Sequence, residues 1–265
     1  MRGVAYGPEP RAQSLEPSSD NLPRPVPPPR PSITAFFPCY NDERTIGTLV
    51  RRAAEQLALV ADDFEILVVN DGSQDGSAAV LDSLAREMPC LKVITHPANR
   101  GYGGALRSGF SNATKELVFY TDGDGQYDVG ELPLLLMLLT PDTDFVNGMK
   151  MTRQDPGYRV FAGNLHRFVM RWSFWLPITD VDCDFRLVRR SIVERVRLTK
   201  NSGSICVELV KLAHRAGAHF REVSVHHYAR EFGESQFFRP GRIAKTYFDL
   251  ARLWVELMIV APFRG

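Results

Sequence analysis

Long apolar segments are missing from this chain of 265 residues. A helix that crosses a bilayer needs roughly 20 consecutive apolar residues, and no stretch of the sequence reaches that length. The longest candidate runs from Trp254 to Phe263 and is interrupted by Glu256. We therefore expect no transmembrane helix. The pattern favours a C-terminal amphipathic helix, either on a membrane surface or docked on the protein's own core.

Cysteine is scarce, and the four cysteines are widely scattered: Cys39, Cys90, Cys183 and Cys206. None of them forms a CxxC pair or lies near a histidine in the spacing of a structural zinc site. Residues 1–30 also lack the apolar core of a signal peptide. Both absences favour buried free thiols in a reducing compartment. We expect a cytoplasmic protein, either free or peripheral on the inner face of the membrane.

An excess of charge of one sign is absent as well. Lys and Arg total 32 against 31 Asp and Glu, which gives a formal net charge of +1. Proteins that bind the phosphate backbone of nucleic acids depend on a clear excess of positive charge. We therefore expect no nucleic-acid partner.

Proline is present in quantity, and it is concentrated near the N-terminus. Residues 22–31 read LPRPVPPPRP, a run that packs neither as a helix nor in a sheet. We predict a disordered or polyproline leader over residues 1–31. The remainder is long enough for one sizeable domain, which we place at 32–240, followed by the amphipathic helix at 241–265.

Short β-rich runs alternate with amphipathic stretches from Ser32 onward. This alternation is typical of parallel strands joined by crossover helices. It predicts an α/β fold with a single doubly wound, mostly parallel sheet and helices on both faces. After residue 150 the rhythm loosens, and we expect a mixed region that completes the sheet. The strands are expected at 33–37, 64–69, 91–95 and 116–120, and the helices at 43–59, about 75–86 and 103–112.

Carboxylates follow the ends of three predicted strands. Asp42 follows the first, Asp71 the second, and Asp122 and Asp124 the fourth. Open parallel sheets bind ligands beyond the carboxyl ends of their strands. We therefore expect these four side chains to converge on one ligand site.

The segment 122–126, with the sequence DGDGQ, carries two carboxylates on a glycine-rich turn. Hard divalent cations prefer carboxylate oxygens, so the turn predicts a metal site. Read alone, the motif is equally compatible with a solvated acidic turn. The neighbouring strand ends at Asp42 and Asp71 favour the metal site.

Several segments resemble family 2 glycosyltransferases in order and approximate spacing. FPCYND at 37–42 looks like that family's Pro-x-Tyr-Asn-Glu opening, although Asp42 is shorter than the expected Glu. VNDGSQDGS at 69–77 is similar to the nucleotide-binding turn, and 122–124 matches the metal turn.

The C-terminal half resembles a narrower group, the polyprenyl-phosphate sugar synthases, which includes dolichol-phosphate mannose synthase. DVDCDFR at 180–186 looks like that group's Asp-x-Thr-Ser-Gly-Phe-Arg, with Cys183 and Asp184 in place of Ser and Gly. VHHYAREFGESQ at 225–236 is similar to its Arg-x-x-Gly-x-Ser-Lys segment, with Gln236 in place of the Lys.

The resemblance implies a GT-A fold, inversion at the sugar carbon, and a UDP- or GDP-sugar donor bound with Mg²⁺ or Mn²⁺. It assigns residues to two tasks: the donor to Pro38, Tyr40, Asp42, Asp71 and Asp122, and the metal to Asp122, Asp124 and Gln126. Our own candidates for the chemical step are Asp124, Asp184, Glu208 and Arg186.

Two kinds of acceptor remain open. A polyprenyl phosphate arrives ionised and needs cations to position it, because arginine forms bidentate contacts with phosphate. A hydroxyl on a soluble metabolite or a glycan needs a carboxylate base instead, for which Asp182, Asp184 and Glu208 are candidates. The acceptor-phosphate candidates are Arg159, Arg186, Arg230 and Gln236.

A non-catalytic nucleotide-sugar-binding protein is a further alternative, with the Pro-rich leader as its partner-binding segment. Among the other motifs, Arg100 to Ala105 lacks the spacing of a dinucleotide fold, and we expect a tight turn into a helix near the donor site. His226 and His227 point to opposite faces of a strand, which favours a structural role. The helix with Arg167, Arg171 and Trp172 packs on the core or contacts a lipid headgroup, consistent with a peripheral membrane contact or a membrane-protein partner.

Overall fold

The computed structural model describes residues 30–151, 157–230 and 240–260. These residues form one mixed sheet of seven strands in the order β3-β2-β1-β4-β6-β5-β7. All neighbouring strands are parallel except those that pair with β6, which runs antiparallel to both β4 and β5. The strands are β1 (Ser32–Cys39), β2 (Asp63–Asn70), β3 (Leu91–Thr95), β4 (Leu117–Thr121), β5 (Phe145–Lys150), β6 (Phe185–Arg189) and β7 (Phe220–Val225).

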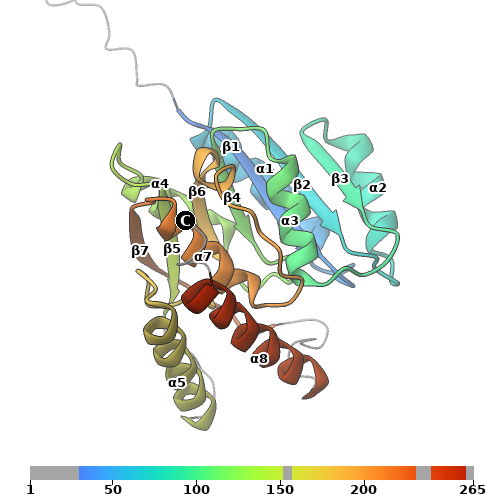
Figure 1. The fold of residues 1–265 in the computed structure, drawn as a ribbon. Coiled ribbons are helices and arrows are strands. Elements are labelled where there is room, and N and C mark those ends of the chain that lie inside the picture. Colours follow the sequence, from blue (N-terminus) through green and yellow to red (C-terminus); the bar gives the residue numbers. More distant parts are fainter. Residues whose placement is uncertain (1–29, 152–156, 231–239, 261–265) are drawn as a thin grey trace, which may run out of the picture.

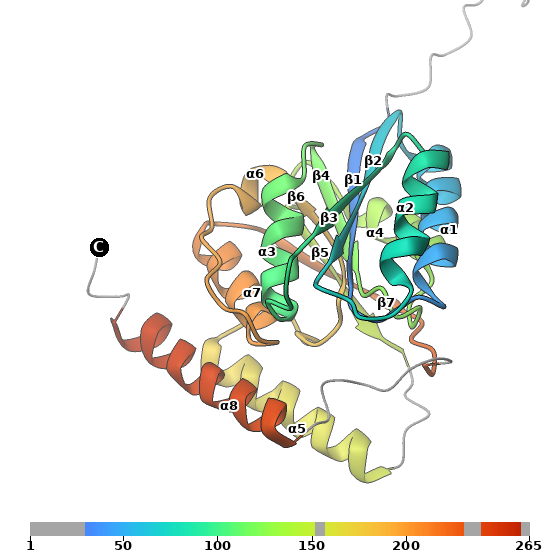
Figure 2. The ribbon, with the colours of Figure 1, turned by 90° about the vertical axis from the view of Figure 1, so that its right-hand side faces the viewer.

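Helices cover both faces of this sheet, as Figure 2 shows, with α1, α2 and α4 on one face and α3, α6 and α7 on the other. The predicted α/β architecture is therefore confirmed. The helices are α1 (Ile46–Val60), α2 (Ser77–Glu87), α3 (Tyr102–Asn112), α4 (Leu132–Leu138), α5 (Gly157–Phe174), α6 (Arg190–Val193), α7 (Ile205–Arg215) and α8 (Pro240–Trp254), with a 3-10 turn at Val129–Glu131 and a π-helical segment at Val255–Val260.

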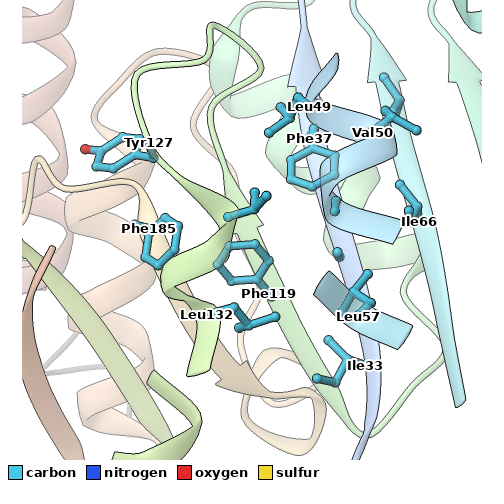
Figure 3. Packing of buried hydrophobic residues seen from close by; sticks show 14 of the residues in the cluster. Ile33, Phe37, Leu49, Val50, Leu57, Ile66, Phe119, Tyr127, Leu132 and Phe185 are labelled. Carbon is cyan, nitrogen blue, oxygen red and sulfur yellow. The ribbon is translucent and has the colours of Figure 1, made fainter. Parts of the chain in front are cut away.

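The two faces have separate cores because side chains alternate along each strand. In β1, Ile33, Ala35 and Phe37 face α1, whereas Phe36 faces α3 with Phe110. Figure 3 shows the first core, where Phe37 and Ile33 lie among side chains of α1, and Phe119 lies between Phe185 and Leu132. The apolar runs that predicted these strands are thus buried on both sides.

The N-terminal strands and helices lie where the sequence places them, with ends shifted by a few residues. The helix expected from residue 43 begins at Ile46, because residues 42–45 form a turn in which the Asp42 carbonyl accepts from the backbone N–H groups of Thr45 and Ile46. Of the predicted leader, only residues 30 and 31 belong to the described part of the chain.

Helices α5 and α8 lie together, away from the layers that cover the sheet (Figures 1 and 2). The indole Nε1 of Trp254 donates to the Ser173 carbonyl at 2.9 Å, and the Tyr247 hydroxyl lies 3.2 Å from Nδ1 of His166. The helix predicted from residue 241 is therefore present as α8. Within the described residues, no helix combines the length and apolar character that a membrane span requires.

Candidate active site

The turns after β1, β2 and β4 meet at one edge of the sheet. The backbone N–H groups of Asn41 and Asp42 donate to the hydroxyl oxygens of Ser73 and Ser77, which follow β2, each at 3.0 Å. The Thr45 hydroxyl donates to the Gly123 carbonyl at 3.0 Å and links the first turn to the third. These contacts bring the three turns together, and a shared ligand site for the four carboxylates stays a prediction.

The turn that carries Asp122 and Asp124 depends on glycine. A Cβ at Gly123 would lie 2.5 Å from the Pro38 carbonyl oxygen, and Gly125 adopts a φ of 76°. Both positions exclude a larger side chain, the first through close approach and the second through its left-handed backbone. The two carboxylates are therefore fixed beside the end of β1.

Negative charge accumulates at this turn. Burial raises the pKa of Asp122 well above its usual range, and the charges of Asp184 and Asp124 raise it further. Burial also raises the pKa of Asp42 to about 6, with an added contribution from Asp124, although the backbone N–H of Tyr40 opposes the shift. Carboxylates that are buried close together favour a neutralising partner such as a cation.

A divalent cation fits this set of side chains. Asp122, Asp124 and the amide of Gln126 offer oxygen atoms, which Mg²⁺ and Mn²⁺ prefer. Across residues 30–151, 157–230 and 240–260, no three His, Cys, Asp or Glu side chains form a complete metal site. Any cation held by these side chains would need further oxygen ligands.

Arg230 closes over the same turn. Its guanidinium forms an ion pair with Oδ2 of Asp124. The adjoining backbone is held in place because Tyr228 donates its N–H to the Gln126 carbonyl at 2.9 Å and accepts from the Gln126 side-chain amide at 3.0 Å. Arg230, predicted to bind an acceptor phosphate, thus lies next to the predicted metal ligands.

Asp184 lies at the same edge and is held by buried neighbours. Its Oδ1 lies 3.4 Å from the Arg186 guanidinium and accepts from the Cys206 thiol at 3.3 Å. Asp184 itself is 8% exposed. Its carboxylate is therefore held in a fixed orientation, close enough for its charge to act on Asp122.

Arg186 is fully buried, with no exposed surface. Besides Asp184, its guanidinium donates to Oδ1 of Asn147 at 2.8 Å, to the Tyr120 hydroxyl at 2.6 Å and to the Val181 carbonyl at 2.5 Å. A phosphate cannot reach a guanidinium that is enclosed in this way. The prediction that Arg186 binds the acceptor phosphate does not fit this arrangement, and its contacts favour a role in positioning Asp184.

Asp71 has an internal set of partners. Its Oδ1 accepts from the Arg100 N–H at 2.8 Å and lies 2.6 Å from Nδ1 of the buried His96, and its Oδ2 accepts from the Gly101 N–H at 2.9 Å. The carboxylate therefore organises the loop that leads into α3. The tight turn expected here is confirmed, since Gly101 has a φ of 83° and the helix starts at Tyr102.

Glu208 binds backbone groups rather than an arginine. Both of its oxygens lie 3.0 Å from the Thr199 N–H, and it also accepts from the Thr199 hydroxyl at 2.6 Å and the Lys200 N–H at 3.0 Å. At 3% exposure, the carboxylate is enclosed. These contacts favour a structural task, and its predicted role as a base stays a prediction.

The other predicted residues are placed as follows. Pro38 is buried and Tyr40 is half-buried at the end of β1. The Arg159 side chain and Gln236 lie outside the described residues. Of the two adjacent histidines, His226 pairs with Glu131 and His227 packs against Tyr127, so they have separate structural contacts.

Sequence reasoning missed two side chains that contact the site, Tyr102 and His96. The Tyr102 hydroxyl donates to Oδ1 of Asp122 at 2.7 Å, and His96 supports Asp71. Neither belongs to a motif of acidic residues. Their position beside predicted strand ends was the only signal in the sequence that could have found them.

Comparisons with known proteins agree with this architecture. The model of the family described as Glycosyl transferase family 2 matches residues 34–197. An undecaprenyl-phosphate 4-deoxy-4-formamido-L-arabinose transferase from Enterobacter sp. (strain 638) is 32% identical over 234 residues, which cover 88% of this chain and 69% of that protein. The chain spans about two thirds of the length of such relatives.

Solved structures show the same fold at low sequence identity. Glucosyl-3-phosphoglycerate synthase from Mycobacterium tuberculosis, solved with Mn²⁺, UDP and its product, has a TM-score of 0.63 at 16% identity, with 85% of this chain and 79% of that chain covered. A mannosyltransferase from Pyrobaculum calidifontis, solved with GDP-Man and Mn²⁺, has a TM-score of 0.62 at 20% identity, with 88% and 68% covered. The chain has the GT-A fold and belongs to glycosyltransferase family 2.

Proposed function

We propose that this chain transfers a sugar, with inversion, from a UDP- or GDP-sugar to a polyprenyl phosphate with the aid of Mg²⁺ or Mn²⁺. The observation that carries the proposal is the Asp122–Asp124 turn at the carboxyl end of β4. It brings excess negative charge next to the strand ends that hold nucleotides in this fold. The name of the Enterobacter relative supports a polyprenyl-phosphate acceptor.

Asp122, Asp124 and Gln126 are the residues that would hold the metal. A bound divalent cation neutralises charge on a departing nucleoside diphosphate. Both similar solved structures were obtained with Mn²⁺ and a nucleotide, which supports the same requirement here.

The acceptor phosphate needs a cation at the same edge of the sheet. Arg230 is the best placed described arginine, because its guanidinium already lies against Asp124. An ionised phosphate attacks without a general base, so Asp184 need not remove a proton in this reaction. Its fixed negative charge beside Asp122 then helps to retain the cation.

We also propose that α5 and α8 contact a membrane surface. Large aromatic side chains are exposed on both helices, including Phe168 (60%) and Trp172 (65%) on α5 and Phe248 (69%) on α8. The exposed basic residues Arg171 and Lys245 lie on the same pair of helices. Aromatic and basic side chains together are typical of helices that bind anionic interfaces, where a lipid-phosphate acceptor is found.

Transfer to lipid tests the main proposal. The full chain is incubated with undecaprenyl phosphate in detergent and with radiolabelled UDP- or GDP-sugars, with and without Mn²⁺. We expect metal-dependent label in an organic extract that mild acid releases, and none with D122N. Label that appears only in water-soluble products would instead establish the hydroxyl-acceptor alternative. Tight donor binding without transfer or hydrolysis would establish a binding protein.

Vesicle flotation tests the membrane contact separately. The wild-type chain should float with vesicles of phosphatidylglycerol and phosphatidylcholine, and the double variant W172A/F248A should stay at the bottom. Leu59 is exposed on α1, on a face of the sheet away from α5 and α8, and L59A serves as the control. Equal flotation of all three proteins would contradict the membrane contact.

A further inference from the structure

Tyr102, the first residue of α3, reaches the metal turn with its hydroxyl. The hydroxyl donates to Oδ1 of Asp122 at 2.7 Å. In the described part of the chain, it is the sole hydrogen bond to the Asp122 side chain. We propose that Tyr102 is a positioning residue that holds the Asp122 carboxylate in the orientation that binds the divalent cation. The inference rests on the metal dependence of the proposed function, and it does not depend on the acceptor.

The chemistry of the hydroxyl group explains why a tyrosine suits this position. Asp122 is surrounded by like charges from Asp124 and Asp184. A lysine or arginine here would orient the carboxylate but would also neutralise it and compete with the cation. A tyrosine hydroxyl donates a hydrogen bond and carries no charge at neutral pH. It therefore fixes one oxygen and leaves the negative charge for the metal.

The backbone around Tyr102 is held from two directions. On one side, the Gly101 N–H donates to Oδ2 of Asp71 at 2.9 Å. On the other, the Gly103 N–H donates to the Asn201 carbonyl at 2.9 Å. A Cβ at Gly103 would lie 2.3 Å from the Lys200 carbonyl oxygen, so the helix start and the 199–203 loop are in direct backbone contact. This double anchorage fixes where the phenol ring projects.

Glu208 belongs to the same arrangement. Its carboxylate binds the N–H groups of Thr199 and Lys200, directly before the residue whose carbonyl accepts from Gly103. Glu208 thus holds the 199–203 loop, and this loop holds the start of α3. Tyr102, at the start of that helix, in turn contacts Asp122. Outer partners of metal ligands of this kind commonly contribute 10–100-fold to metal affinity, as a rough guide.

Mn²⁺ binding to the full chain tests the inference directly. Free Mn²⁺ is titrated by electron paramagnetic resonance in the presence of UDP or GDP, without any acceptor. We expect Y102F to weaken Mn²⁺ binding about 10-fold, the lower end of the range for outer partners. The matched control is Y247F, which removes a tyrosine hydroxyl that contacts His166 on α5, and it should bind Mn²⁺ like the wild type.

A double-mutant cycle separates positioning from general destabilisation. If Tyr102 acts through Asp122, Y102F should have no further effect on Mn²⁺ affinity in a D122N background. Additive effects, or wild-type affinity in Y102F, would overturn the inference, as would a wild-type chain that binds no Mn²⁺ with either nucleotide. A chain that shows the full Y102F effect but transfers no sugar to lipid would refute only the proposed acceptor.

Discussion

Replacing Glu208 by Gln distinguishes a base from a structural carboxylate. In the wild type, the carboxylate accepts from three donors: the Thr199 N–H, the Thr199 hydroxyl and the Lys200 N–H. Glutamine keeps a single acceptor oxygen and turns an NH₂ group towards a backbone N–H. The variant therefore loses the charge and leaves at least one buried donor unsatisfied.

The expected loss follows from these contacts. Hydrogen bonds to a charged group contribute about 1.5–3 kcal/mol each, and an unsatisfied buried donor costs about 1–3 kcal/mol. Because the glutamine oxygen still accepts one or two of the bonds, we expect E208Q to lower the free energy of unfolding by about 2–4 kcal/mol. In a chain of this size, that corresponds to a melting temperature lower by roughly 5–15 °C.

Thermal melting and steady-state kinetics together decide between the two roles. If Glu208 is structural, E208Q melts early, while kcat at saturating donor and Mn²⁺ changes little when it is assayed well below the melting temperature. The matched control is E194Q just after α6, where Glu194 forms an exposed pair with Arg190, and its stability should change by less than about 0.5 kcal/mol. A wild-type melting temperature with a kcat reduced about 100-fold or more would refute the structural reading and indicate a base.

Two further changes test the frame around the site. G103A should destabilise the protein and weaken Mn²⁺ binding, because the added Cβ would meet the Lys200 carbonyl oxygen at 2.3 Å. Thermal melting and Mn²⁺ titration measure the two effects. G241A is the control because nothing lies within 4 Å of a Cβ at that position. E65Q should lower the free energy of unfolding by about 2 kcal/mol at pH 7, because the bonds from Lys92, Thr114 and Thr34 outweigh burial and lower the pKa of Glu65 to about 2. Because the pKa of Glu65 is lower in the folded state, its contribution to stability is present above the unfolded pKa near 4.5 and is lost as the pH falls towards 2. The urea unfolding curves of wild type and E65Q should therefore converge at low pH. A difference in stability that persists at low pH would contradict this role of Glu65.

The strands and the position of the ligand site could be predicted because both depend on local patterns. Apolar runs such as 64–69 fill strands that are buried on both faces, and ligands bind beyond the carboxyl ends of parallel strands, where the sequence has its acidic residues. Asp42 therefore lies beside the 122–124 turn, next to Gly123. These conclusions require no knowledge of which strands are neighbours.

The role of Arg186 could not be predicted, because it depends on strand order. β6 lies between β4 and β5, and in that register Arg186 is opposite Tyr120 on one side and Asn147 on the other. Those two neighbours provide two of the oxygens that satisfy the guanidinium, with the Val181 carbonyl as a third. Tyr120 and Asn147 are distant from Arg186 in the sequence, so the motif at 180–186 alone does not reveal them. The pairing of β6 with β4 and β5 therefore buries Arg186 among structural contacts, although the sequence predicts that it binds a ligand.

Replacing Asp184 by Asn distinguishes a phosphate acceptor from a hydroxyl acceptor. A phosphate acceptor is already ionised, so D184N should lower kcat by less than about 10-fold, whereas a hydroxyl acceptor that relies on this carboxylate should lose about 100-fold or more. The substitution also weakens the contact with the buried Arg186, so melting temperature must be followed alongside activity. D142N is the control because Asp142 is exposed and is not a candidate base. A loss of about 100-fold in D184N, with folding preserved and D142N active, would refute the lipid-phosphate acceptor.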